Sequence, residues 1–274
     1  MSQTSAATQP DDLLVEHQDG VRILKFNRPE ARNALTPTML DCLSDELARA
    51  EQDPEVGSIL LTGAGGAFCA GGDVKAMAAS HTSGTPIDSV ARMERQRHNH
   101  RGTSLRLYEM SKPTIAALPG PAAGAGFSLA LACDMRIAAE NAVMTTAFVK
   151  VGLTGDYGGT YLLTQMVGTS KARELYLLGD RIKMDEALRL GLVNWVVPDA
   201  ELPERALEIA KRLAAGPRVA QGLIKENLNR ALKSNFAECL DMESANLSTA
   251  RLTEDHKEAA IAFAEKRTPT FVGR

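Results

Sequence analysis

The sequence has few cysteines, and they are not spaced like the ligands of a metal or the pairs of a disulfide framework. No CxxC pair and no histidine at metal-ligand spacing accompanies the four of them, Cys42, Cys69, Cys133 and Cys239. Small secreted domains built on disulfides, and zinc sites of known spacing, are therefore excluded. The apolar, small-residue surroundings of Cys69 and Cys133 predict buried thiols in a reducing cytoplasm, and we expect no metal.

The chain also lacks a large excess of positive or negative charge. The 31 Lys and Arg residues are balanced by 34 Asp and Glu residues, which leaves a net charge of −3. Nucleic-acid binders use a strong basic field, so we expect no nucleic-acid partner. An acidic small molecule would have to be bound by local basic groups.

No unbroken apolar segment of membrane length occurs. Residues 113–133 carry no charge, but prolines and glycines interrupt them at Pro119, Gly120, Pro121, Gly124 and Gly126, so we predict no membrane helix there. The start, MSQTSAATQPDDLL, lacks a basic region followed by an apolar core and is not a signal peptide. We expect residues 1–10 to be a disordered tail on a cytoplasmic protein.

What is present is enough apolar sequence for a large core, with 44% hydrophobic residues among 274. Strands alternate with helices through about residue 203, beginning with a hairpin around Asp19-Gly20, a helix over 38–52 and a strand over 57–62. This alternation favours an α/β core over residues 11–203 with parallel pairing. Residues 204–274 predict helices only, over 204–214, 218–233, 236–252 and 254–266, and we expect this helical C-terminal region to mediate oligomerisation.

The chemistry is predicted to centre on residues 112–134. An apolar strand over 114–118 is stopped by Pro119-Gly120-Pro121, and Gly124-Ala125-Gly126 then opens a helix of small residues. Small residues let a ligand approach the free N–H groups of the first helical turn, where the helix dipole favours negative charge. The alternative is that they only permit close packing in a buried layer.

A second glycine-rich turn covers residues 63–73, but it does not match a nucleotide-binding loop. In GxGxxG register, Phe68 stands where the last glycine belongs, and no GxxxxGK[ST] sequence occurs. The polar residues 80–89 predict a mobile loop over the site. In the helix predicted over 90–110, we interpret the arginines, His98 and His100 as a solvated face rather than a binding patch.

These segments together resemble the crotonase (enoyl-CoA hydratase/isomerase) family over nearly the whole chain. The matching pieces are Asn27-Arg28-Pro29 with Asn33-Ala34-Leu35, then residues 66–73, 112–134, 158–160 and 263–267. The resemblance implies a spiral of ββα repeats and a C-terminal trimerisation region, hence a homotrimer or a dimer of trimers. It also implies an acyl-CoA thioester as substrate, with coenzyme A entering only as part of that substrate and no permanently bound cofactor.

The resemblance further implies site residues. The backbone N–H groups of Gly72 and Ala125 would form an oxyanion hole for the thioester carbonyl. A path for CoA would run along Arg32, Ala70, Asp73 and Lys75, with Phe148 in the acyl pocket and with Phe263 and Lys266, from this or a neighbouring subunit, near the adenosine end. For Lys75 and Lys266, an ordinary exposed lysine is the alternative.

The departures from the family are informative. Hydratases of the family use two glutamates, and Ser128 and Phe148, which occupy those positions here, cannot titrate usefully. Asp156 in FVKVGLTGDYGG resembles the aspartate of the ring-epoxide and Δ3,Δ2-enoyl-CoA isomerases, although Thr154-Gly155 replaces their aliphatic residue and proline. Asp156 is therefore predicted to be the catalytic acid/base, with the N-cap of the following helix as an alternative or additional role.

An isomerase is accordingly predicted. Enoyl-CoA hydratase (a lyase) is the main alternative, and a non-catalytic module that binds CoA esters or RNA is another. A substitution with Asp156 as nucleophile is the weakest of these, because the sequence shows no base to activate water for its second step.

Overall fold

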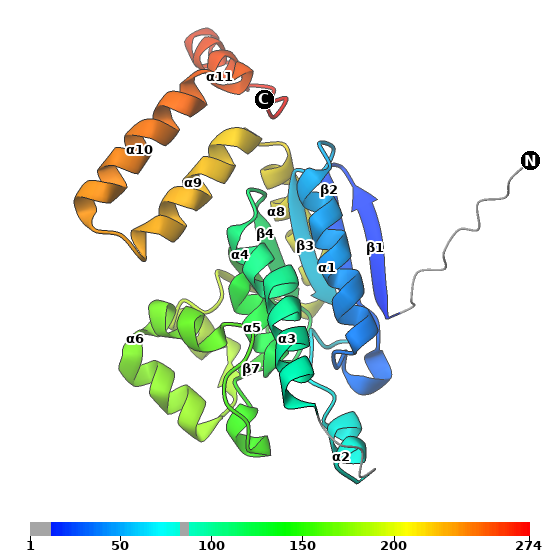
Figure 1. Cartoon of the computed structure of the whole chain (residues 1–274). Coiled ribbons are helices and arrows are strands. Elements are labelled where there is room, and N and C mark those ends of the chain that lie inside the picture. The colour runs from blue at the N-terminus through cyan, green and yellow to red at the C-terminus, as the bar shows by residue number, and fades with distance from the viewer. Residues whose placement is uncertain (1–11, 83–87) are drawn as a thin grey trace, which may run out of the picture.

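The computed structural model describes residues 12–82 and 88–274 (Figure 1). The tail predicted over residues 1–10 lies outside the described residues, as does the middle of the loop predicted over 80–89. The two ends of that loop are helical, because α2 (Val74–Thr82) precedes it and α3 (Ser89–His100) follows it.

The core is a six-stranded sheet in the order β1-β2-β3-β4-β6-β9. The predicted hairpin is confirmed: β1 and β2 pair antiparallel and turn at Asp19 and Gly20, both with positive φ. All the other pairs in this sheet are parallel, as the alternation of strands and helices predicted. The strands are β1 (Leu13–Gln18), β2 (Val21–Phe26), β3 (Ser58–Gly63), β4 (Thr114–Leu118), β6 (Met135–Ala139) and β9 (Trp195–Val197).

Two helices pack on this sheet. The helix α1 (Pro37–Gln52) begins where the Thr36 side chain accepts a bond from Met39 N, and it buries Met39, Leu43 and Leu47. The helix α8 (Leu202–Ala214) lies behind the sheet in Figure 1 and buries alanines along one face. A Cβ at Gly57 would lie 2.5 Å from the Ala214 carbonyl oxygen, so α8 comes very close to the start of β3.

A second, three-stranded sheet is built from β5 (Ala122–Ala123), β7 (Val143–Thr145) and β8 (Ile182–Lys183). Strands of two or three residues are too short to show an alternating pattern, which is why the sequence did not predict this sheet. This small sheet holds the chain just before α5 (Ala125–Ala132), the helix of small residues, because β5 ends one residue before the N-cap Gly124 and α5 follows.

The remaining helices surround this centre. The single-turn helices are η1 (Pro29–Ala31), η3 (Phe148–Val151) and η4 (Asp199–Glu201), and α7 (Met184–Arg189) follows β8. The helix α6 (Gly159–Leu178) joins the two helices predicted separately there, and Gly168, with φ 75°, kinks it between them.

The helix predicted over residues 90–110 has an unexpected middle. It consists of α3, a π-helical turn η2 (Arg101–Leu105) and α4 (Arg106–Glu109). At the π turn, a Cβ on Gly102 would lie 2.1 Å from Ser44 Oγ, so this turn fits directly against α1. The helix is therefore fixed to the core by its C-terminal half.

The C-terminal helices match the prediction closely: α9 (Arg218–Ala231), α10 (Phe236–Arg251) and α11 (Glu254–Glu265). Figure 1 shows α10 and α11 extending away from the core. The boundary predicted near residue 204 falls inside α8, which packs on the sheet, so the helices that leave the core begin after α8. No helix in residues 12–82 or 88–274 combines the length and apolar character that spanning a membrane requires.

Candidate active site

Each of the two glycine-rich turns predicted from the sequence carries one backbone donor, Ala125 in the first and Gly72 in the second. Gly124, with φ 53° and ψ −121°, is the N-cap of α5, and Ala125 is the first residue of that helix. Within the described residues, no hydrogen bond uses the N–H of Ala125 or the N–H of Gly72. Both groups are thus left for a ligand, at the positive end of a helix dipole in the case of Ala125.

Close packing brings the segments of these two donors together. At Gly71, where φ is +88°, a Cβ would lie 3.1 Å from Ala125 N and 2.7 Å from Ala123 O. At Gly126, a Cβ would lie 2.3 Å from the Cys69 carbonyl oxygen. The small residues therefore do permit close packing, and the same packing sets Gly72 beside the first turn of α5. The oxyanion role of Gly72 and Ala125 stays a prediction.

The loop that carries Asp156 packs on the same helix. A Cβ at Gly159 would lie 2.2 Å from Ser128 Oγ, so the first residue of α6 contacts α5 one turn after Ala125. Tyr157 is buried, and burial raises its pKa above the ordinary value, with the neighbouring Asp156 charge acting in the same direction. Asp156 is thereby held near the opening of α5.

The Asp156 carboxylate accepts two hydrogen bonds and is in close contact with a histidine ring whose Nε2 makes no hydrogen bond with any described residue. Its Oδ1 lies 2.6 Å from His100 Nε2 and accepts a bond from Tyr157 N at 2.9 Å, and its Oδ2 accepts a bond from Gln96 Nε2 at 2.9 Å. The N-cap of α6 is Gly158, without a side-chain cap bond. The interpretation of Asp156 as the N-cap of this helix is therefore wrong, because the carboxylate points to α3 instead.

The sequence analysis missed Gln96 and His100. The prediction of a solvated face is wrong for His100, whose side chain is 31% exposed and whose ring packs edge-on against Tyr157 with 4.5 Å between centroids. The one available signal was their spacing of four residues, which puts both side chains on the same face of a helix. Nothing in the sequence related that face to a loop 56 to 60 residues further along.

The two positions where glutamates would be expected in a hydratase are occupied by groups without acid/base function. Ser128 Oγ donates to Gly124 O at 3.3 Å. Phe148 is buried, stacks on Tyr176 with 6.2 Å between centroids and lies against Gly124. Burial raises the pKa of Tyr176 to about 12, so this side of the site is apolar and uncharged at neutral pH.

Three of the residues predicted to follow CoA lie at one edge of the site. Ala70 N donates to Arg32 O at 2.9 Å, and Asp73 follows Gly72 directly. The Asp73 carboxylate accepts from Ala76 N at 3.0 Å and lies 3.5 Å from Arg28, and these interactions hold its pKa below the ordinary value. Lys75 is exposed on α2, as its alternative interpretation also requires.

The structure does not bring the last two predicted residues to this site within one chain. Phe263 is 87% exposed on α11, and Lys266 follows at the C-cap of that helix. Figure 1 shows α11 and α2 at opposite ends of the molecule. Contact of Phe263 and Lys266 with CoA would therefore require a neighbouring subunit, the second possibility given by the sequence.

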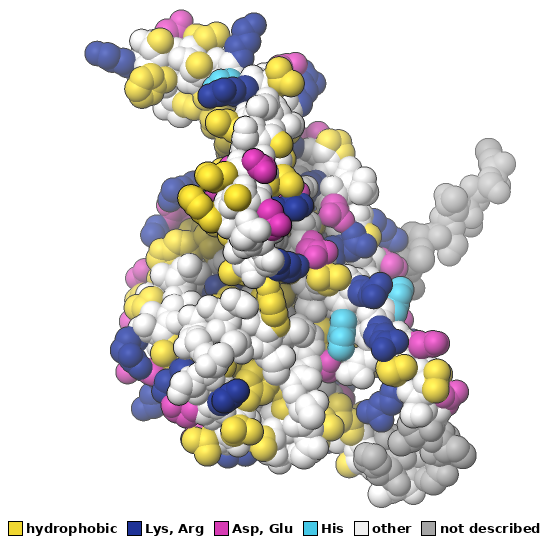
Figure 2. Space-filling model, turned by 60° about the vertical axis from the view of Figure 1, so that its left-hand side comes forward, with side chains coloured by type: hydrophobic (Ala, Val, Ile, Leu, Met, Phe, Trp, Pro, Cys, Tyr) yellow, Lys and Arg dark blue, Asp and Glu magenta, His cyan; other side chains and the backbone are white. Residues whose placement is uncertain are grey.

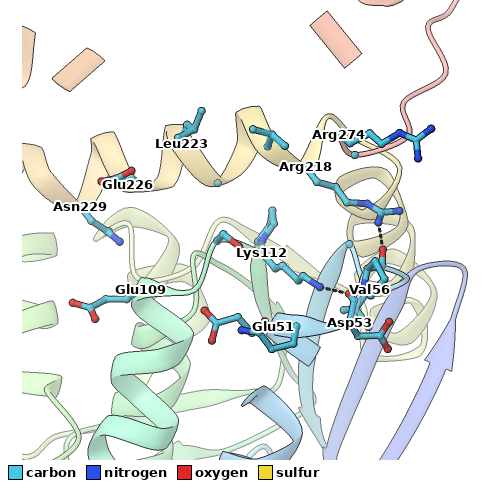
Figure 3. Close-up of a pocket in the computed structure, with 18 of the residues that line it drawn as sticks. Glu51, Asp53, Val56, Glu109, Lys112, Arg218, Leu223, Glu226, Asn229 and Arg274 are labelled. Atoms are coloured by element: carbon cyan, nitrogen blue, oxygen red, sulfur yellow. Dashed lines mark hydrogen bonds between the residues drawn. The ribbon is translucent and has the colours of Figure 1, made fainter. Parts of the chain in front are cut away.

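A cleft of about 1110 Å³ lies elsewhere, between α9 and the turn after α1 (Figure 3). Its cations are occupied: Lys112 Nζ donates to Ala50 O at 2.6 Å, and Arg218 donates to Pro54 O. Lys112 precedes β4, whereas Ala125 follows it, and ligands of open parallel sheets bind at the carboxyl ends of strands. The cleft is thus distinct from the candidate active site. The part of the chain that the structure describes holds no cluster of three or more potential metal ligands.

Comparisons with known proteins identify the family of the chain. A family model described as enoyl-CoA hydratase/isomerase matches residues 16–274. The 1,2-epoxyphenylacetyl-CoA isomerase of Escherichia coli (strain K12) is 37% identical over 264 residues, which cover 96% of this chain and 99% of the relative. The short-chain-enoyl-CoA hydratase of Clostridium acetobutylicum is 36% identical over 260 residues, covering 94% and 96%.

Solved structures show the same fold. The enoyl-CoA hydratase from Polaromonas sp. JS666 superimposes with a TM-score of 0.89 at 34% identity, over 94% of this chain and 99% of that one. The fold is the α/β fold of crotonase-like proteins with a helical C-terminal region. The chain belongs to the enoyl-CoA hydratase/isomerase family.

Proposed function

We propose that this enzyme isomerises an acyl-CoA thioester, shifting a double bond or a ring isomer through a thioester enolate. Coenzyme A takes part only as a portion of the substrate, and no permanently bound cofactor is needed. In a double-bond shift, Asp156 removes a proton from the carbon next to the thioester carbonyl and returns it two carbons along the chain. The N–H groups of Gly72 and Ala125 hold the enolate oxygen meanwhile.

The observation that carries this proposal is that the loop with Asp156 packs on α5 through the contact of Gly159 with Ser128, while Ser128 and Phe148 stand where a hydratase of the family would have glutamates. One carboxylate suffices for a 1,3 shift, because it acts first as base and then as acid. Asp73 is no substitute, since its lowered pKa keeps it ionised and paired with Arg28.

Two known effects would lower the activation barrier of the isomerisation, namely stabilisation of the enolate oxygen and acid/base catalysis. A preorganised N–H donor in a dry site stabilises a developing oxyanion by roughly 2.7–4 kcal/mol. A positioned acid/base group contributes about 10²–10⁴-fold in rate. The uncharged wall of Phe148 and Tyr176 favours both, because electrostatic interactions are stronger where water is excluded.

Hydration of an enoyl-CoA is the second candidate, and one observation favours it. His100 Nε2 lies 2.6 Å from Asp156 Oδ1, so the site contains a second titratable group that the sequence did not reveal. One group could then activate water while the other delivers a proton. The same imidazole would be the base that a nucleophilic role of Asp156 lacks.

The proposal is tested by giving the enzyme β,γ-enoyl-CoA and α,β-enoyl-CoA esters of several chain lengths and following isomerisation and water addition in parallel. Isomerisation that exceeds hydration by at least 10-fold in kcat/KM is expected. Faster hydration would replace the proposal by the second candidate. Binding of the CoA esters without turnover of any of them would leave only a binding module.

A further inference from the structure

We propose that Gln96 and His100 form a clamp on α3 that aims the Asp156 carboxylate at the substrate, so that both are positioning residues of the reaction. This inference rests on the proposed function, since it takes Asp156 as the acid/base. It concerns a helix outside the loops that carry Gly72, Ala125 and Asp156.

The clamp leaves one place for the proton of the substrate. A carboxylate offers about four lone-pair sites. Tyr157 N donates to Oδ1, the His100 Nε2 atom lies 2.6 Å from the same oxygen without making a hydrogen bond to it, and Gln96 Nε2 donates to Oδ2. Oδ1 is thus covered by Tyr157 and by the His100 ring, whereas Oδ2 has the single contact with Gln96, so the three groups leave Oδ2 as the more open oxygen and fix the direction of the carboxylate.

The helix α3 positions the side chains of Gln96 and His100. Gln96 and His100 lie one turn apart on one face, and the helix starts at Asp88, whose side chain accepts from Val90 N and Ala91 N at 3.0 Å. The π turn begins directly after His100. An inserted residue of this kind rotates the following side chains relative to the preceding ones, and such turns occur frequently at functional sites.

That rotation separates two tasks along one helix. Within the π turn Gly102 fits against Ser44, and after it Leu107 is fully buried, which anchors the C-terminal half. Before it, Gln96 and His100 reach the Asp156 loop, and the His100 ring supports Tyr157 at 4.5 Å between centroids. The clamp thereby connects the catalytic loop to the α1 side of the core.

Loss of either clamp side chain should lower turnover and leave substrate affinity nearly unchanged, because neither Gln96 nor His100 is placed on the CoA path. A misaimed group of this kind costs roughly 10- to 100-fold in rate. Since His100 also packs against Tyr157, its two contributions must be separated. His100→Phe keeps a ring and loses the polar nitrogen beside Oδ1, whereas His100→Gln loses the ring and keeps a polar group that can reach this oxygen.

The experiment measures kcat and KM for isomerisation, and the thermal midpoint, of Q96A, H100F and H100Q. His98→Ala is the matched control, because His98 is exposed on the same helix. We expect kcat to fall at least 10-fold in Q96A and H100F with KM within threefold, at least partial recovery of kcat in H100Q, and unchanged kinetics in H98A.

Parent-like kcat in both Q96A and H100F would overturn the clamp, and so would a loss in H100Q as large as that in H100F. Asp156→Asn, measured alongside, separates this failure from that of the proposed function. An inactive D156N with fully active clamp variants refutes only the clamp, whereas a fully active D156N refutes the acid/base assignment and the clamp together.

Discussion

Lys225 on α9 donates from Nζ to Asp134 Oδ2 at 2.9 Å and to Leu107 O at 2.8 Å. Asp134 Oδ2 also accepts from Thr114 N at 2.7 Å, at the start of β4. The Lys225 side chain is only 9% exposed. One buried ammonium therefore attaches the helices that leave the core to the strand that leads into the candidate active site.

Removal of this ammonium is predicted to destabilise the protein. Lys225→Met leaves the Asp134 carboxylate and a buried carbonyl without their charged partner, and a hydrogen bond to a charged group contributes about 1.5–3 kcal/mol. The free energy of unfolding in urea should fall by that amount. Lys257→Met, at an exposed position of α11, is the control and should change it by less than about 0.5 kcal/mol. Equal values for the two variants would contradict the assigned role.

The close contact of α5 with the segment around Cys69 gives a second prediction. The methyl group of Gly126→Ala would lie 2.3 Å from the Cys69 carbonyl oxygen, which is backbone and cannot move aside cheaply. Overpacking of this kind costs about 1–3 kcal/mol. The methyl group of Gly72→Ala meets only the flexible end of Met77, so this variant should lose less stability in the same urea titration. A smaller loss in G126A than in G72A would refute the packing argument.

The buried thiols predict how stability depends on alkaline pH. Burial raises the pKa of Cys69 and of Cys133 to about 12, from an ordinary 9.0. The unfolded chain therefore loses these two protons first, so their contribution to stability is complete below pH 9 and decreases as the pH rises from 9 toward 12. Urea titrations between pH 8 and 11 should show this decrease, and it should be weaker in Cys133→Ala. An equal slope in the variant would argue against the thiol as its source.

The helices that leave the core predict an assembly. Phe236, Leu252 and Phe263 are 78%, 89% and 87% exposed, and Figure 2 shows hydrophobic side chains gathered over this upper part of the molecule. Large exposed apolar side chains in one region favour a protein interface. We propose a homotrimer or a dimer of trimers, and sedimentation at micromolar concentration should give one of these masses. A monomer at that concentration would contradict the proposal.

Patterns within one segment predicted most of the fold. The hairpin around Asp19-Gly20, the helix over 38–52 and the helices of the C-terminal region were all predicted from local sequence, and each matches the structure. The predicted donors Gly72 and Ala125 do lie on adjoining segments, because the glycines beside them mark a close approach of two backbones.

Contacts between distant segments were not predictable in this way. No local pattern relates His100 to Asp156, because their contact depends on how α3 crosses the core and on the π turn that follows His100. The arginine-rich sequence of α3 predicted a face exposed to solvent, and its arginines are exposed, whereas Gln96 and His100 face the loop of Asp156. The strands β5, β7 and β8 were missed because pairing defines them, not composition.

The role of Asp156 as the single acid/base is tested most directly by Asp156→Asn. The amide keeps the size and most of the hydrogen bonds of the carboxylate but cannot take a proton, so the rate of β,γ to α,β isomerisation should fall by about 10²–10⁴-fold. CoA-ester binding, measured by titration calorimetry, should stay within threefold of the parent. Isomerisation at the parental rate in this variant would contradict the account.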